Sequence, residues 1–307
     1  MVIIKYGSGG SFTHMSRSTR DALAGGFANV ISFDLEHWYT ATLLRDEVDD
    51  PIDRIETSVE IVLDVLDEHE TAATFFVVGD VAREYPELIE RVADAGHEIA
   101  SHGQTHTPLF ELTPEAFTEE LDASADAIET AIGRRPTGFR APNFSVTPRT
   151  RWAFDALLET GYRYDSSVFP VKTPMYGVNG APVSPYWVDR RRPFIDASPS
   201  DTDDLFELPL AVFHPRVRIP TAGGFYGRIL PRWLLSRGIS NLNRRGIPAT
   251  IYFHPWEFNP EVRVDGVPAH KRFISFHGLD RAREKLGELL AAHEFTTCKR
   301  VMELYDH

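Results

Sequence analysis

Residues 29–34, NVISFD, and residues 72–78, AATFFVV, are short apolar runs with the length and composition of buried β-strands. Between them, apolar residues recur at the spacing of one helix face: Ile55, Val59, Val62 and Leu66. A strand, a helix and a second strand in this order form a parallel βαβ unit. This stretch therefore predicts an α/β protein with a parallel sheet.

The same alternation continues along the chain. Further strands are predicted at 97–101, 137–140, 162–165 and 249–254, and helices at 86–95, 113–132, 147–161, 231–245 and 279–293. About seven or eight such units in roughly 290 residues suit a (β/α) barrel. An open doubly wound sheet is the alternative, but no glycine-rich phosphate loop follows the first strand.

Two segments differ from this pattern. Residues 172–220 are rich in proline and weakly periodic, so we expect an insertion or lid over one end of a single-domain barrel. Residues 1–14 are rich in Gly and Ser and indicate an added tag before a native Met15, which leaves 15–307 for the barrel. No apolar segment follows Lys5, so no signal peptide is predicted and we expect a cytoplasmic protein.

The charge balance excludes several classes of partner. The 307 residues include 32 Lys and Arg against 45 Asp and Glu, a net charge of −13. This disfavours nucleic acids and strongly acidic glycans, because both would be repelled. No run of ~18 apolar residues predicts a transmembrane segment. The one cysteine, Cys298, excludes a disulfide framework and a cysteine-rich metal site.

Side chains able to perform acid–base or metal chemistry follow the predicted strands at their carboxyl ends. They are Asp34, Glu36, His102, His106, Arg140, Asp165 and His254. In a parallel barrel these ends form one rim, where catalytic residues gather. We therefore expect a single site there, although the Asp-Ser-Ser sequence at Asp165 slightly favours a simple turn.

His102 and His106 are four residues apart, so on a helical turn both rings face one way and can share a metal ion. Solvated or locally bonded histidines are the alternative, but the position just after a strand, on a loop with Gly103, favours the metal. Glu36 is the best candidate for a third ligand. Two imidazoles and a carboxylate with open positions are typical of catalytic zinc.

Asp34, Arg140 and His254 are predicted to act beside that metal ion. Asp34, otherwise a turn or cap residue, becomes a general base next to metal-bound water. Arg140, otherwise a surface cation, would keep that carboxylate ionised and oriented. His254, otherwise a core histidine, can serve as general acid because its ordinary pKa lies near neutrality.

Aromatic residues adjoin the predicted base and acid. Trp38 and Tyr39 follow Asp34, and Trp256 follows His254. These rings and Glu257, which follows Trp256, can line a cleft. The rings can stack on sugar rings, which predicts a carbohydrate ligand. Ordinary core packing is the alternative.

Seven segments occur in the order known from one enzyme family: SFDLEHWY, ATFFVVGDVA, HEIASHGQTH, GFRAPNFS, YDSSVFP, GGFYGRILP and YFHPWEF. Over residues 30–258 the chain resembles the polysaccharide deacetylases of the carbohydrate esterase family 4 type. It looks most like the subgroup associated with bacterial exopolysaccharide export. The resemblance implies a distorted (β/α)7 barrel and metal-dependent removal of N-acetyl groups from an N-acetylated glycan.

The resemblance also implies roles for single residues. Asp34 matches the family's catalytic base and Arg140 the arginine that pairs with it. His254 matches the acid, and His102 and His106 match the metal-binding histidines.

The backbone N–H of Asn143 matches a group that helps to hold the oxyanion. The commonest first motif of the family has two adjacent aspartates, whereas Leu35 occupies the second place here. In the subgroup that the chain resembles, an acid one residue later takes this role, and Glu36 fits it. We expect one divalent ion, Zn²⁺ first, with Co²⁺ or Ni²⁺ as alternatives.

Two other functions remain open. A hydrolase of another C–N bond, such as that of a cyclic ureide in an allantoinase-like reaction, would use the same ligands. A non-catalytic carbohydrate-binding barrel would not need Asp34 and His254, and both are present.

Overall fold

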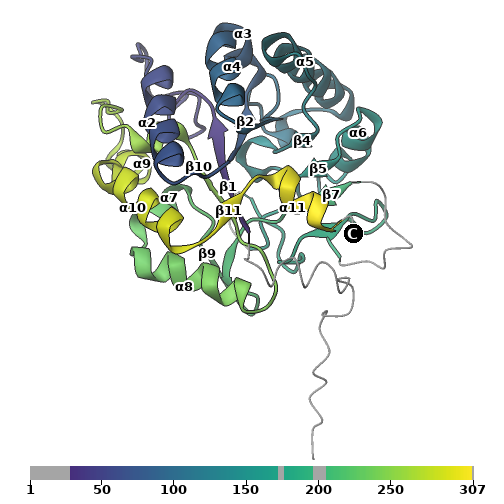
Figure 1. Cartoon of the computed structure of the whole chain (residues 1–307). Helices are drawn as coiled ribbons and strands as arrows, with labels where there is room; N and C mark the ends of the chain where they lie inside the picture. The colour runs from purple at the N-terminus through teal and green to yellow at the C-terminus, as the bar shows by residue number, and fades with distance from the viewer. Residues whose placement is uncertain (1–27, 172–175, 196–204, 306–307) are drawn as a thin grey trace, which may run out of the picture.

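Parallel strands form the main sheet of the computed structural model, which describes residues 28–171, 176–195 and 205–305 (Figure 1). Within these residues the parallel order is β10, β1, β2, β3, β4, β5, β7, and β6 joins β7 in antiparallel orientation. The bounds are β1 Asn29–Leu35, β2 Thr74–Val77, β3 Glu98–Ser101, β4 Gly138–Phe139, β5 Tyr164–Asp165, β6 Tyr186–Trp187, β7 Phe206–Glu207 and β10 Thr250–Phe253.

The sheet curls towards closure, because Leu210, just after β7, forms a bridge with Thr250 of β10. A hairpin of β8 and β9 lies apart from the sheet, and β11 pairs with β1. Their bounds are β8 Val212–His214, β9 Val217–Pro220 and β11 Phe295–Thr296. The predicted distorted (β/α)7 barrel is confirmed.

Helices surround the sheet on its outer side, except α11, which lies across one end of the barrel (Figure 1). They are α2 Ile55–Glu68, α3 Gly79–Glu84, α4 Pro86–Asp94, α5 Pro114–Ile132, α6 Ala153–Glu159, α7 Gly224–Ile229, α8 Arg232–Asn243, α9 Ala269–Phe276, α10 Leu279–Ala292 and α11 Cys298–Tyr305. In α5, Thr113 caps the first turn by accepting from the backbone N–H of Ala116, and Gly133 ends the helix at a φ of 71°. Among the described helices, none has the length and apolar character needed to cross a membrane.

Some predicted elements differ from those observed. The helix expected from residue 147 begins at Ala153, because Thr147 and Thr150 form a hydrogen-bonded turn. The described part of 172–220, expected to be an insertion, contributes β6 and β7 to the main sheet as well as the β8–β9 hairpin. Residues 1–14 lie outside the described residues.

The alternation of side chains along β1 separates the two faces of the sheet. Ile31, Phe33 and Leu35 pack into the core beneath the helices. Ser32 and Asp34 point to the opposite face, the barrel interior, because successive strand residues alternate. Apolar residues and α11 fill the amino end of that interior: Val30, Phe76, Ala100, Tyr164, Phe206, Cys298 and Met302. Asp34 lies nearer the carboxyl end of β1, beyond this apolar cluster.

Candidate active site

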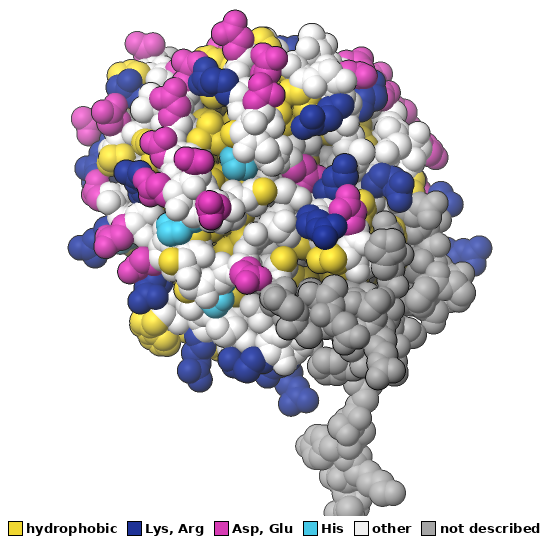
Figure 2. All heavy atoms as spheres, in the orientation of Figure 1, with side chains coloured by type: hydrophobic (Ala, Val, Ile, Leu, Met, Phe, Trp, Pro, Cys, Tyr) yellow, Lys and Arg dark blue, Asp and Glu magenta, His cyan; other side chains and the backbone are white. Residues whose placement is uncertain are grey.

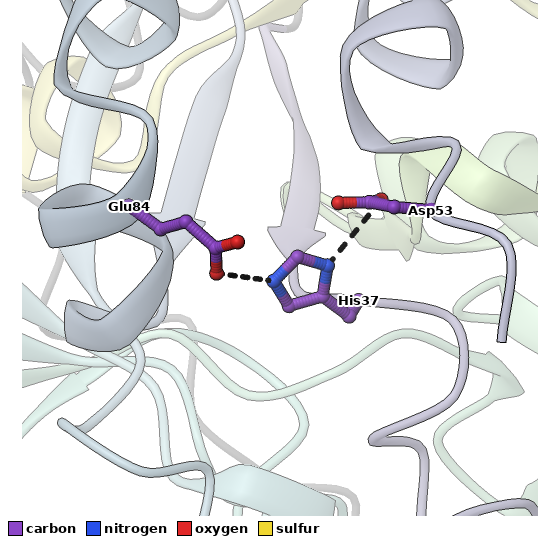
Figure 3. Close-up of side chains that lie close together, drawn as sticks. All are labelled: His37, Asp53 and Glu84. Carbon is purple, nitrogen blue, oxygen red and sulfur yellow. Dashed lines mark ion pairs between the residues drawn. The ribbon is translucent and has the colours of Figure 1, made fainter. Parts of the chain in front are cut away.

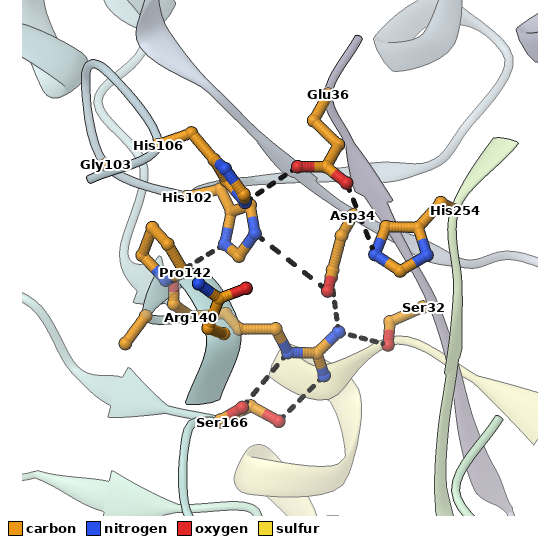
Figure 4. Close-up of polar contacts among 12 residues, drawn as sticks. Ser32, Asp34, Glu36, His102, Gly103, His106, Arg140, Pro142, Ser166 and His254 are labelled. Carbon is orange, nitrogen blue, oxygen red and sulfur yellow. Dashed lines mark hydrogen bonds and ion pairs between the residues drawn. The ribbon is translucent and has the colours of Figure 1, made fainter. Parts of the chain in front are cut away.

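Arg140 and Asp34 form a buried ion pair in the barrel interior (Figure 4). The guanidinium donates from Nη1 to Oδ1 of Asp34 across 2.6 Å and to Oγ of Ser32 across 2.9 Å. It also donates from Nε to the carbonyl of Ser166 at 3.0 Å and from Nη2 to Oγ of Ser166 at 2.9 Å. Because a buried charge needs a partner and full hydrogen bonding, this network fixes the position of the Asp34 carboxylate.

His102 directs one ring nitrogen into the site. Its Nδ1 lies 2.7 Å from the carbonyl oxygen of Arg140, and a carbonyl can only accept, so Nδ1 carries the proton. Nε2 then presents a lone pair, 4.0 Å from Oδ2 of Asp34. Burial and the neighbouring His106 hold the pKa of His102 well below its ordinary value, so the ring is neutral. A neutral imidazole oriented by a backbone carbonyl is the usual form of a metal ligand.

Glu36 and His106 meet beside this lone pair (Figure 4). Oε2 of Glu36 lies 2.7 Å from Nε2 of His106 without a hydrogen bond in the described residues, and both side chains are buried. Burial raises the pKa of Glu36, but the neighbouring imidazoles, above all those of His106 and His254, outweigh it, so the pKa lies below its ordinary value. The carboxylate is therefore ionised.

The loop that carries His106 is held in a strained shape. His106 has a φ of 59°, in the left-handed region that few residues other than glycine adopt. Glu120 of α5 stabilises the loop by accepting from the backbone N–H groups of Gln104 and Thr105 at 2.8 and 2.9 Å. Glu120 was not predicted from the sequence, because it lies on the next helix and not beside the histidines whose loop it supports.

Glu36, His102 and His106 together fit a divalent ion. Oε2 of Glu36 is buried next to His106 and has no hydrogen-bond partner within the described residues, and the Nδ1 contact of His102 leaves its Nε2 lone pair free for a ligand bond. This donor set is that of catalytic zinc sites, in which positions remain open for water or substrate. Deacetylases of the carbohydrate esterase 4 type are metal-dependent in general.

His254 lies on the other side of Glu36, with Nε2 3.5 Å from Oε1 of that residue (Figure 4). Its Nδ1 faces Oε2 of Glu257 at 3.7 Å, and the same oxygen accepts from the His254 backbone N–H at 3.2 Å. Burial lowers the pKa of His254, but Glu257, Glu36 and Asp34 together raise it to about 9. The ring is therefore positively charged near neutral pH and can donate a proton.

Glu257 is in turn paired with Arg228 at 3.0 Å. From the sequence alone Glu257 was expected only to line the cleft, and Arg228 was not predicted to have a role. The spacing of three residues between His254 and Glu257, on one short 3₁₀ turn over Pro255–Phe258, is the signal that could have shown this contact.

Asn143 occupies a strained turn beside His102. It has a φ of 55° in the turn Pro142–Phe144, and its side chain donates to Oγ1 of Thr42 at 2.6 Å. Its backbone N–H forms no hydrogen bond within the described residues. A strained residue with a free donor is suited to holding a ligand oxygen.

Asp165 lies below this layer and does not face the metal donors. It is buried beside Glu207, accepts from Oγ of Ser167, and has a pKa raised by burial to about 6. Ser167 accepts from the backbone N–H of Ala141 at 2.8 Å. Asp165 therefore supports the loop next to Arg140, the structural role that its sequence slightly favoured. Glu207 was missed because it lies in the segment expected to be an insertion.

Trp38 and Trp256 are too buried for their ring faces to stack on a sugar. Trp38 is 3% exposed and donates from Nε1 to the carbonyl of Ile52. Trp256 is 6% exposed and stacks on His254, with ring centroids 5.3 Å apart. Both rings therefore fit the packing alternative better than the predicted stacking on sugars. Tyr39 is half-buried and stacks on His37 at 4.8 Å.

A second cluster joins His37, Asp53 and Glu84 outside this site (Figure 3). Nδ1 of His37 faces Asp53 at 3.5 Å, and Nε2 faces Glu84 at 3.4 Å. The ring thus stands between the carboxylates, and one ligand atom from each of the three residues lies within 4.8 Å of the other two, so the cluster could also hold a metal ion. The cluster ties the end of β1 to the start of α2 and to α3.

Comparison with known proteins identifies two regions. Residues 47–164 match the family model described as polysaccharide deacetylase, and residues 166–303 match a domain of unknown function, DUF3473. A chitooligosaccharide deacetylase from Bradyrhizobium sp. (strain ANU 289) is 42% identical over 82 residues, which are 26% of this chain and 37% of that protein. The peptidoglycan-N-acetylmuramic acid deacetylase PdaA from Bacillus subtilis is 35% identical over 81 residues, which are 26% of this chain and 31% of that protein.

The matched part of this chain spans no more than 37% of the length of the curated relatives first compared with it. A crystal structure of a candidate polysaccharide deacetylase from Mycobacterium smegmatis matches more widely. It has a TM-score of 0.53 and 25% identity, and the match covers 81% of this chain and 77% of that chain. Residues 47–164 of the chain therefore match the polysaccharide deacetylase family, and the structural likeness to a protein of that description extends over most of the chain.

Proposed function

We propose that the protein hydrolyses N-acetyl groups of amino sugars in a polysaccharide or oligosaccharide and releases acetate. One observation supports this most: Asp34, paired with Arg140, lies next to His102, and His254, charged beside Glu257, lies next to Glu36. Amide hydrolysis needs a base for the water and an acid for the amine, and this arrangement offers both. Relatives named as chitooligosaccharide and peptidoglycan deacetylases support the same reaction class.

Glu36, His102 and His106 would hold one divalent ion, Zn²⁺ by preference, with Co²⁺ or Ni²⁺ as alternatives. When bound, the ion polarises the acetyl carbonyl and makes a nearby water more acidic. The longer side chain of Glu36, in place of an aspartate at the position of Leu35, is the feature of this chain that sets its choice of metal.

Asp34 would accept the proton of the attacking water. Its Oδ1 is already occupied by Arg140, so Oδ2, on the side of His102, is the oxygen that receives the proton. The fixed guanidinium keeps the carboxylate oriented between turnovers. The oxyanion that develops on the acetyl carbonyl would accept from the backbone N–H of Asn143, a contribution typically of about 3 kcal/mol per donor.

His254 would protonate the departing amine through Nε2, the ring nitrogen on the side of Glu36. An amine leaves poorly as an anion, so without this proton the amide bond reforms. The match to DUF3473 suggests that the substrate belongs to an exopolysaccharide export system.

Acetate release from N-acetylglucosamine and its oligomers up to the tetramer tests the proposal, with allantoin as the competing substrate. We expect release to rise from monomer to tetramer, because binding of remote sugars contributes to turnover. Equal cleavage of monomer and tetramer would contradict a polymeric substrate. Faster turnover of allantoin would favour the cyclic ureide reaction, and binding of the oligomers without turnover would favour a carbohydrate-binding barrel.

A further inference from the structure

A cleft of about 960 Å³ opens beside the candidate active site, between the end of α7, helix α9 and the start of α10. These three helices lie together in Figure 1. The cleft is lined by the basic residues Arg228, Arg263, Arg272, Arg281 and Lys285 and by the acidic residues Asp265 and Asp280. The lining therefore carries an excess of three positive charges in a chain of net charge −13.

Two of the four arginines in the lining have an acidic partner, and two have none within the described residues. Arg263 pairs with Asp280 at 2.6 Å, and Arg228 with Glu257. Arg272 and Arg281 are exposed and form no ion pair within the described residues.

Lys285 is surrounded by carbonyl oxygens, including that of Arg228 at 2.6 Å, and by positive charges. Burial, Arg228 and Arg281 lower its pKa, so the cleft floor is crowded with like charge. An anion entering the cleft would relieve this repulsion.

The charge of the chain is distributed unevenly over its surface. Helix α2 carries five acidic residues and no Lys or Arg, whereas α8, next to the cleft along the chain, carries two arginines and no acid. Figure 2 shows acidic side chains gathered over the upper part of one face and basic ones along its lower edge, over α8. The net charge, which disfavours acidic glycans for the whole chain, is therefore no guide to this cleft.

Direct contacts connect the cleft to the acid side of the catalytic centre. Arg228 lines the cleft and pairs with Glu257, which faces His254. Phe276, also in the lining, contacts the ring of Trp38, with centroids 6.2 Å apart. The cleft and the candidate acid thus lie on either side of one buried wall, which contains Arg228 and Glu257.

We propose that the cleft binds an acidic sugar residue, bearing a carboxylate or a phosphate group, of the same glycan whose N-acetyl group is hydrolysed. Arg272 and Arg281 can each donate two hydrogen bonds to the oxygens of such an anion. Phe273, which is 51% exposed in the wall, offers a ring for the apolar face of a sugar. This inference rests on the proposed function and deepens it, since it names the class of glycan.

The test compares two tetramers, one of alternating hexuronate and N-acetylhexosamine and one of N-acetylglucosamine alone. The variant is Arg272→Glu with Arg281→Glu. Both sites lie near the start of a helix, where glutamate is well tolerated, so the fold should persist. Arg134→Glu, an exposed arginine just after α5, is the matched control. Calorimetric binding is measured alongside acetate release.

We expect the double variant to bind the acidic tetramer at least 10-fold more weakly than wild type and to cleave the neutral tetramer within 2-fold of wild type. Arg134→Glu should match wild type on both. Equal affinity of the double variant and Arg134→Glu for the acidic tetramer would overturn the inference. So would inhibition of neutral cleavage by inorganic phosphate that depends on Arg272 and Arg281, because the cleft would then serve a free phosphate. Binding of the acidic tetramer through these arginines without acetate release would support the cleft and refute the deacetylase proposal.

Discussion

Arg228 donates from Nε to Oε1 of Glu257 across 3.0 Å, and both side chains are only 2% exposed. Two further donations, to the carbonyls of His277 and Ile274, hold the guanidinium in place. Glu257 is thereby fixed in a position from which its other oxygen faces His254. The pair is thus a support for the candidate acid, built from two elements distant in the chain.

Replacing Glu257 with Gln should impair the acid without removing it. We expect kcat for an N-acetylated tetramer to fall at least 10-fold, because the amide keeps the shape but loses the charge that favours protonated His254. Cleavage of an aryl acetate ester should fall less than 3-fold, since its leaving group departs without a proton. The ratio of the two kcat values is the measurement.

Glu261→Gln is the matched control, because Glu261 is an exposed acid in the same segment whose nearest cation, Arg54, is 3.6 Å away. It should leave both substrates at wild-type rates. Equal losses on amide and ester in Glu257→Gln would point to a general structural defect and contradict the role of Glu257.

Asp34→Asn should separate metal binding from proton transfer. We expect metal content near that of wild type and turnover at least ~10²-fold lower, the usual size of a general-base contribution. The neutral amide also leaves Arg140 buried without its counter-ion, so the free energy of unfolding should drop by about 3 kcal/mol or more. Near-normal turnover at full metal content would place the base elsewhere.

Arg140→Lys provides a second view of the same pair. Lysine retains the charge but cannot reach Asp34, Ser32 and Ser166 with the fork of donors that arginine uses. We expect slower turnover with unchanged affinity for the tetramer. A change in affinity alone would show that Arg140 acts on substrate binding instead.

Loss of the metal should abolish activity but not the fold. We expect a chelator to stop acetate release and Zn²⁺ or Co²⁺ to restore it, with about one ion per chain. His102→Ala should contain little metal and retain the circular dichroism of wild type, because a barrel of this size buries ample core. His270→Ala, at an exposed histidine of α9, is the control. Full activity in metal-free His102→Ala would refute the site.

The sequence predicts the central part of the fold well because strand and helix periodicities are strong there. In β1, Ile31, Phe33 and Leu35 face the helices, and this alternation also predicts that Asp34 points inwards. Where strands shrink to two residues, as in β4 and β5, periodicity carries little information. Here the identity of the side chain at the strand end, Arg140 or Asp165, was the better guide.

Of the candidate site, only the residues that would act directly on the metal ion or the substrate were predictable. Glu36, His102 and His106 would bind the metal ion with their own side chains, so their residue types point to that role. Glu257 and Arg228 act only through other side chains, and an acid or arginine in a sequence is most often a surface residue. The role of Trp38 could not be decided for a related reason, because an aromatic residue next to a base can equally belong to the core, and its burial favours that alternative.

His97 should make stability depend on pH, apart from catalysis. It is buried, accepts from the backbone N–H of Ala73 at 3.2 Å through Nδ1, and has a pKa lowered by burial to about 4. Between pH 6.5 and 4, His97 is therefore protonated in the unfolded chain but stays neutral in the folded chain. The free energy of unfolding should fall as pH drops through this range, by at most about 3 kcal/mol, and level off below it.

Urea unfolding of wild type and His97→Gln at several pH values measures this, since glutamine keeps an acceptor for Ala73 but does not titrate. We expect the difference in unfolding free energy between the two proteins to shrink as pH falls, with the exposed-site variant His270→Gln following wild type. A constant difference across the range would mean that His97 is not the group responsible.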